Sequence, residues 1–396
     1  MQTSAVSDHA SRRTVGGWMG VLSAFCASLV GIGMARFAYT PLLPAIIGAH
    51  WFQPSAAIYL GAANLAGYLA GALTGRPIAA RLTSTAALRA MMVVATVSFF
   101  ACAYPLGFPW FFVWRFCAGL AGGALMVLAA PTVLPHLPPS RRGLAGGIIF
   151  MGVGAGIAAS GTLVPILLNE GLRQSWLGLG AVALLLTLIS WRGWPAEKAV
   201  SPVAHHKRPG TATLFALYAE YALNAAGLVP HMLFLVDFIA RGLGEGVQVG
   251  AEYWVLFGLG AIAGPIVSGY LADRLGVARV LRISYLIEAA AVVLPVLGGG
   301  TSSLMLSSVV VGAFTPGIVP LVLGRVHELL AHHPSAQKLA WSRATVSFAI
   351  AQAGAAYGLS YILARTGDYH QLFIVGASAL TLAFVIDLAF ARRAEG

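Results

Sequence analysis

The chain has 396 residues, of which 58% are hydrophobic and only 9% are charged, and its mean hydropathy is +0.82. Soluble domains carry roughly 25% charged residues, which keep their surfaces in water. This composition therefore excludes a soluble enzyme or binding domain and indicates a multi-pass membrane protein. In such a protein the formal net charge of +11 reports topology, so we expect no nucleic-acid partner.

Twelve apolar segments follow one another along the chain, each near the roughly 20 residues that a membrane-spanning helix needs. The first six cover residues 18–46, 55–76, 87–105, 108–134, 143–168 and 172–191. The second six cover residues 212–239, 249–271, 278–298, 302–324, 343–364 and 370–390. The sequence predicts an all-α membrane protein with twelve transmembrane helices in two pseudo-symmetric six-helix bundles. We place the bundles at 1–192 and 212–396, joined by a polar cytoplasmic linker at 193–211.

Lysine and arginine are unequally distributed between the expected sides of the membrane. Of the 24 basic residues, 19 fall at the termini, in the linker or in every second connection, from Arg12 and Arg13 onward. The opposite connections hold only Arg173, Arg241 and Arg365. Basic residues gather on the cytoplasmic side of membrane proteins. We therefore expect both termini to be cytoplasmic and the protein to lie in a bacterial inner membrane.

The two halves repeat one another. Gly71 and Arg76 lie at the end of the second apolar segment, and Gly269 and Arg274 lie at the end of the eighth, at a constant offset of 198 residues. Duplicated halves place a binding site between them near the membrane midplane, where rocking exposes it to either side in turn.

The segment from Gly269 to Gly276 reads GYLADRLG, which closely resembles the loop signature of the major facilitator superfamily (MFS). The resemblance implies an MFS fold in which Gly269, Asp273 and Arg274 latch one conformation. Gly71 and Arg76 are the matching residues of the first copy, which has Gly75 where the acidic residue belongs.

Two further segments extend the resemblance. Arg115, followed by Gly119, is similar to the helix-4 motif of proton-coupled members, which implies a role for Arg115 in proton transfer. The segment 31–44, GIGMARFAYTPLLP, resembles the helix-1 signature of the YbfB/YjiJ-type branch. The seventh segment, 212–239, is called helix 7 here. With GLVPH at 227–231 and FLVDF at 234–238, it resembles that branch as well.

Helix 7 carries a polar stripe. Glu220, Asn224, Gly227 and His231 are spaced so that they share one helical face. Burial favours the protonated form of a carboxyl group, which makes Glu220 a candidate proton carrier, and histidine titrates near neutral pH, which makes His231 a second. The alternative is a stripe that only forms hydrogen bonds to other helices.

An arginine inside a helix bundle needs a carboxylate or an anionic ligand, because it keeps its proton. We expect Arg36 to bind substrate unless its side chain reaches the membrane rim. The other candidate substrate-binding residues are Tyr39, Asn64, Tyr68, Asn224 and Gln352. Asn64 and Tyr68 share a face with glycines, so close helix packing is an alternative. Glu288 and Asp387 are isolated acids that can equally pair with loop arginines.

The sequence does not match the motifs of common enzyme chemistry. His327 and His332 lie five residues apart and so on different faces of a helix, which is unsuited to a zinc protease site. None of the three lysines follows a glycine, so the sequence has no Walker A loop. We expect no catalytic residues, no metal and no cofactor.

The sequence predicts a secondary active transporter that moves a small anionic or polar organic solute by alternating access and is coupled to protons. Its partners would be that solute, protons and the lipid bilayer, and we expect a monomer. One alternative is a proton-driven multidrug efflux antiporter that binds lipophilic cations through Glu220. Another is a non-transporting membrane sensor. The sequence leaves symport and antiport open.

Overall fold

Backbone N–H and C=O groups inside a lipid bilayer must be satisfied within the protein, and helices achieve this within one segment. A computed structural model describes residues 17–138, 141–195, 212–298, 300–331 and 334–395. These described residues form helices and no strands. Arg12, Arg13 and most of the segment 193–211 lie outside them, so the division into 1–192 and 212–396 stays a prediction.

The first half contains six helical spans. Its first span, Gly17–Gly48, is helical from its start but includes a π-helical segment, η1 (Leu29–Met34), followed by α2 (Ala35–Phe37) and α3 (Tyr39–Gly48). The other five are α4 (Pro54–Arg81), α5 (Ser84–Cys102), α6 (Phe108–Val133), α7 (Arg142–Leu168) and α8 (Leu172–Ser190).

The second half has the same arrangement. Its first span, Ala212–Gly242, consists of α9 (Ala212–Val229), the π segment η4 (Pro230–Phe234), α10 (Leu235–Asp237) and the π segment η5 (Phe238–Gly242). The other five are α11 (Gly246–Leu275), α12 (Val277–Val293), α13 (Gly300–Leu329), α14 (Pro334–Thr366) and α15 (Tyr369–Glu395).

Among the described residues, eleven helices are long and apolar enough to cross a membrane. The twelfth, α12, has only 17 residues and continues into the 3-10 turn Leu294–Val296. It also carries Arg279, Arg282 and Glu288, which lower its hydropathy. The prediction of twelve transmembrane helices in two six-helix bundles is confirmed.

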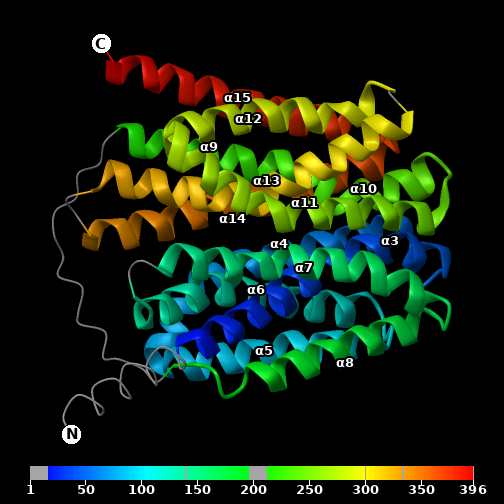
Figure 1. Ribbon diagram of the computed structural model, residues 1–396. Coiled ribbons are helices and arrows are strands. Elements are labelled where there is room, and N and C mark those ends of the chain that lie inside the picture. Colours follow the sequence, from blue (N-terminus) through cyan, green and yellow to red (C-terminus); the bar gives the residue numbers. More distant parts are fainter. Residues whose placement is uncertain (1–16, 139–140, 196–211, 299, 332–333, 396) are drawn as a thin grey trace, which may run out of the picture.

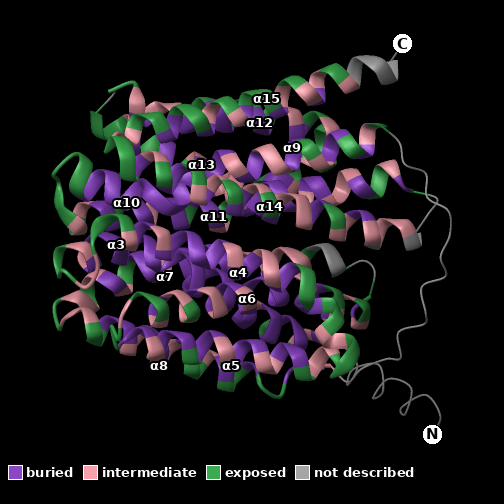
Figure 2. Cartoon of the chain, turned by 180° about the vertical axis from the view of Figure 1, so that it is seen from behind, coloured by how far each residue is buried: buried purple, intermediate pink, exposed green. Residues whose placement is uncertain are grey.

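The two halves lie one against the other (Figure 1). We call the side that holds Gly17 and the C-terminal end of α15 the terminal side, and the opposite side the far side. The main contacts between the halves are made by α7 with α11 and by α4 with α14. Buried residues are concentrated in the inner helices (Figure 2), so any central site lies between the halves.

Within each half, glycines allow two helices to touch backbone to backbone. A Cβ atom added at Gly119 of α6 would overlap the carbonyl oxygen of Asn64 in α4, and one at Gly71 would overlap that of Leu120. In the second half, a Cβ atom at Gly264 of α11 would overlap the carbonyl oxygen of Ala313 in α13. The second and fourth spans of each half therefore form a closely packed pair.

The π segments η1 and η4 overlap when the halves are superimposed at the sequence offset of 198 residues. Each has a local cause. Gly31 and Gly33 weaken the helix in η1, and Pro230 begins η4 without a backbone N–H to donate. Single π turns inside α-helices often occur at functional sites, and both segments here adjoin the interface between the halves.

Candidate functional site

A cavity lies between the halves near the middle of the bundle. Its empty volume is about 530 Å³, counted with the space at its mouth. Its lining comes from both halves and consists of Ile32, Arg36, Phe37, Tyr68, Met126, Phe150, Val153, Tyr221, Met232, Thr315, Pro316, Val319, Thr345, Phe348 and Gln352. Three of the six sequence-predicted substrate-binding residues, Arg36, Tyr68 and Gln352, are therefore brought together there.

Arg36 is the charged residue of the cavity lining. It is held on α2, directly after η1, and its side chain is buried. The guanidinium lies 5.1 Å from the ring centroid of Phe37 and 5.0 Å from that of Tyr68. Its Nη2 is 3.9 Å from the Sδ of Met232, and its Nε has no hydrogen-bond partner. No described carboxylate lies within ion-pair distance of Arg36, so its charge is balanced only by aromatic faces and a thioether.

A second unsatisfied polar group lines the same cavity. Gln352 of α14 donates from Nε2 to the Sδ of Met232 at 3.6 Å, while its Oε1 has no partner. Met232 thus joins Arg36 from the first half to Gln352 from the second. Free hydrogen-bonding groups beside aromatic rings suit a ligand that is flat, apolar in its body and anionic at one end.

The halves meet closely on the far side of the cavity. Thr40 donates to the carbonyl oxygen of Met232, and the rings of Phe37 and Trp254 lie 5.9 Å apart. The rings of Tyr59 and Tyr357 stack at 6.3 Å between α4 and α14. The cavity lies on the terminal side of these contacts.

Some helix glycines on the terminal side have open space beside them, as Gly354 and Gly358 of α14 do. A Cβ atom added at Gly146 or Gly147 of α7, or at Gly269 of α11, would meet no atom within 4 Å.

Arg115 lies in the first half, behind α2 and outside the cavity lining. Its Nη1 donates to the carbonyl oxygen of Ala35 at 2.9 Å, and its guanidinium lies 4.4 Å from the ring centroid of Tyr39. Asn64 donates to the carbonyl oxygen of Arg115 at 3.1 Å. These three predicted site residues hold the helix that presents Arg36. Their roles in proton transfer and substrate binding stay predictions.

The polar stripe of helix 7 forms one face, as the spacing predicts, but this face points into the second half. Asn224 donates to Oε2 of Glu288 at 2.6 Å, and Nε2 of His231 lies 2.7 Å from the hydroxyl of Ser307. A Cβ atom at Gly227 would overlap Leu380 of α15. The stripe therefore contacts α12, α13 and α15, and Asn224 lies outside the cavity lining.

Glu220 is buried on α9, next to the cavity-lining Tyr221. No described cation forms an ion pair with Glu220. Arg282 binds Asp387 at 2.5 Å instead. Arg282 and Asp387 both lie on the terminal side of the second half, where they interact electrostatically with Glu220.

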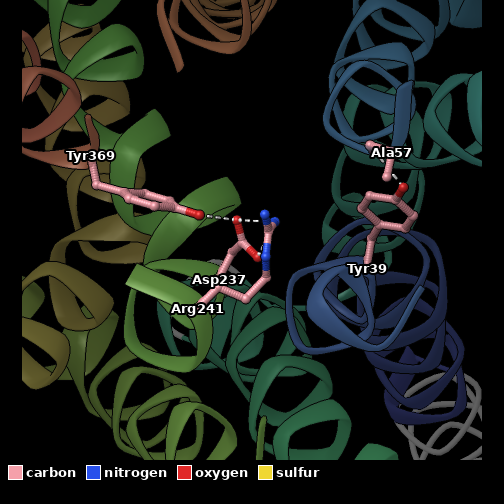
Figure 3. Close-up of polar contacts among 5 residues, drawn as sticks. All are labelled: Tyr39, Ala57, Asp237, Arg241 and Tyr369. Carbon is pink, nitrogen blue, oxygen red and sulfur yellow. Dashed lines mark hydrogen bonds and ion pairs between the residues drawn. The ribbon is translucent and has the colours of Figure 1, made fainter. Parts of the chain in front are cut away.

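A polar cluster ties the far end of helix 7 to α15. The fully buried Asp237 accepts a hydrogen bond from the hydroxyl of Tyr369. It also forms an ion pair with Arg241, whose Nη1 lies 3.1 Å from Oδ1. At the position 198 residues earlier, Tyr39 donates to the carbonyl oxygen of Ala57 at 2.6 Å. Figure 3 shows both contacts, one in each half. Equivalent positions thus fasten the first helix of each half to a neighbouring helix.

Replacing Tyr369 with phenylalanine is expected to lower the free energy of unfolding by about 1–3 kcal/mol, because a buried carboxylate loses one of its two donors. The thermal unfolding of the purified protein measures this. Tyr361→Phe is the control, since Tyr361 is 53% exposed and contributes its ring to Arg365. Equal stability of the two variants would contradict the role given to Tyr369.

The residues of the MFS loop signature form the last turns of α11 and end at Gly276, which joins α11 to α12. Arg274 stacks on Tyr270, with its guanidinium 4.3 Å from the ring centroid. Gly71, from the first copy, is buried in the contact between α4 and α6, whereas Arg76 is exposed. Latching by these residues stays a prediction.

Sequence reasoning missed several residues of the cavity. Tyr221 and Met232 lie on helix 7 beside the polar residues that the stripe analysis selected. The sequence does contain a signal for them. Tyr221 and Met232 are large side chains that lie off the polar face of the same helix. Phe150 and Phe348 gave no separate signal in a sequence with 19 phenylalanines.

Comparison with known proteins agrees with this fold. The pattern of a family described as uncharacterised MFS-type transporter YbfB matches residues 28–388. A gallate transporter from Pseudomonas putida is 27% identical over 298 residues, which cover 64% of this chain and 65%, just under two thirds, of that protein. The xylose transporter XylE from E. coli, in a partially occluded inward open conformation, superimposes with a TM-score of 0.73 at 14% identity, covering 95% of this chain and 98% of XylE. The XylE match shows the fold alone.

Proposed function

The chain belongs to the MFS transporters of the YbfB type, and on that premise we propose that it transports a small aromatic carboxylate across the bacterial inner membrane. The observation that carries the proposal is Arg36, which is buried in the cavity between the halves and pairs with no described carboxylate. The solute's carboxylate pairs with the guanidinium, and alternating access exposes the cavity to each side in turn.

The rest of the cavity supports an aromatic body for the solute. Rings of Phe37, Tyr68, Tyr221 and Phe348 line it together with Met126 and Met232. Gln352 contributes a free Oε1, which can accept a hydrogen bond from a hydroxyl group. Gallate, a hydroxylated aromatic carboxylate, combines these features, and a relative of this chain is a gallate transporter.

The proposal extends to coupling and orientation. Protons drive transport, with Glu220 as a carrier on the terminal side of the second half, and both termini lie in the cytoplasm. His231 contributes through its hydrogen bond to Ser307. The excess of arginine in the connections of the terminal side supports this orientation.

Efflux of lipophilic cations fits the cavity less well. A cation site in a low-dielectric cavity needs a carboxylate or a set of unoccupied aromatic faces. The described lining contains no acidic residue, Glu220 is not part of it, and Arg36 occupies the faces of Phe37 and Tyr68. The positive charge at the centre favours an anion.

A thermal-shift titration of the detergent-purified protein tests this function. Gallate at 100 times its Kd is expected to raise the free energy of unfolding by about 2.7 kcal/mol. Benzoate at the same concentration should raise it by less, because benzoate lacks the hydroxyl groups and binds more weakly. Tetraphenylphosphonium and xylose are the controls and should give no shift. Stabilisation by tetraphenylphosphonium alone would contradict the anion assignment and favour drug efflux.

A further inference from the structure

The second half contains a buried carboxyl group that the cavity does not use. Glu288 lies on α12 and is 0% exposed. Its Oε2 accepts a hydrogen bond from Nδ2 of Asn224 at 2.6 Å. Its Oε1 has no partner, and neither has Oδ1 of Asn224. The two side chains that share this hydrogen bond thus each leave one oxygen unsatisfied.

No described cation balances Glu288. On its own helix α12, Arg282 is paired with Asp387 of α15, and Tyr285 has an unpaired hydroxyl. The helix 7 span contributes Glu220, an acid, and His231, whose Nε2 is bound to Ser307 of α13. Tyr285 interacts electrostatically with Glu220, Asp387 and Glu288. The surroundings of Glu288 therefore hold negative charge or none.

A single proton satisfies this arrangement. A protonated carboxyl group is a donor as well as an acceptor, and an amide oxygen is an acceptor. A proton on Oε1 of Glu288 turns that oxygen into a donor, for which Oδ1 of Asn224 is the free acceptor, and it removes a charge whose burial is costly. We propose that Glu288 and Asn224 form the proton-binding site of the transport cycle.

The position of Asn224 links this site to the cavity. Asn224 lies on α9 between Tyr221 and Met232, which both line the cavity. Loss of the proton from Glu288 leaves a carboxylate that accepts from Asn224 but no longer donates, so the contact between α9 and α12 changes. Glu220, one helical turn before Asn224, lies on the terminal side and serves as the entry point for protons.

This inference rests on the proposed proton coupling, but the site itself can be tested without any solute. Infrared spectra of the full-length protein at neutral pH should contain the carbonyl stretch of a protonated carboxyl group that Glu288→Gln removes. Glu220→Gln is the matched control and should leave that band in place. Asn224→Ala keeps the acid but should shift its band, because the amide partner is gone. A spectrum that Glu288→Gln leaves unchanged overturns the assignment.

Transport in proteoliposomes tests the role in coupling, with gallate as the probe. The wild-type protein should accumulate gallate under a pH gradient. Glu288→Gln, which mimics the protonated state, should lose at least tenfold of this accumulation and keep gallate exchange without a gradient. Normal accumulation by Glu288→Gln overturns the inference and leaves the proposed function standing. A wild-type protein that exchanges gallate but ignores the gradient overturns both the coupling and this inference.

Discussion

Replacing Arg36 with alanine is expected to raise the Kd for gallate by about 30-fold or more. Removing one partner of a buried, hydrogen-bonded charge pair costs about 2–5 kcal/mol, and each 1.4 kcal/mol corresponds to a factor of ten. The guanidinium is placed to give this energy, because it contacts Phe37, Tyr68 and Met232 and pairs with no described carboxylate. Calorimetric titration of the purified protein measures the change.

Two further variants separate charge from geometry. Arg36→Lys keeps a positive charge but loses the planar fork that pairs with a carboxylate, so an intermediate Kd is expected. Arg89→Ala is the matched control, because Arg89 also lies over an aromatic ring, that of Trp191, but outside the cavity. Binding by Arg36→Ala that equals that of Arg89→Ala would rule out Arg36 as the carboxylate site.

The sequence predicts the fold well because apolar length is a direct physical requirement of the bilayer. All twelve predicted segments correspond to helices, and the weakest, α12, is the one that carries Glu288 and two arginines. The repeat at 198 residues predicts equivalent halves, and the paired π segments extend that equivalence to local structure. Gly31, Gly33 and Pro230 weaken the helix at these places, but they do not specify a π turn by themselves, since it also depends on how neighbouring helices pack.

The candidate site is only partly predictable. A stripe analysis identifies which residues share a face of helix 7 but not which neighbour that face meets. In the structure Asn224 pairs with Glu288 and His231 with Ser307, both in the second half, and these partners could not be read from the spacing. Arg36 is identified by the cost of a charge in a membrane span, which is independent of direction. Arg115 has the same property, yet its guanidinium donates to the backbone of Ala35, a contact that requires the tertiary structure.

Substitution of Gly119 by alanine is expected to lower the free energy of unfolding by about 3 kcal/mol or more. Overpacking a well-filled contact costs typically 1–3 kcal/mol and occasionally more. At Gly119 the added methyl group would overlap the carbonyl oxygen of Asn64, which belongs to the backbone of another helix. Backbone atoms have no alternative rotamer, so α4 and α6 must separate. Denaturant titration of the purified protein, followed by helical circular dichroism, measures the loss.

The control for Gly119→Ala is Gly354→Ala in α14. Gly354 also lies inside a helix, but a Cβ atom there would meet nothing within 4 Å. Alanine should therefore be neutral or stabilise the protein by about 0.5–1 kcal/mol, because it is the better helix former. Loss of stability in both variants would show that the helix position, and not the contact with α4, determines the effect.

The duplicated architecture gives the same prediction for the second half. Gly264→Ala would press a methyl group against the carbonyl oxygen of Ala313, and its cost should be similar to that of Gly119→Ala. The first-half variant should do one thing more. Asn64 and Arg115 form the hydrogen bonds behind α2 at this contact, so separating α4 from α6 also displaces Arg36. Gly119→Ala should therefore weaken gallate binding more than Gly264→Ala does at equal loss of stability.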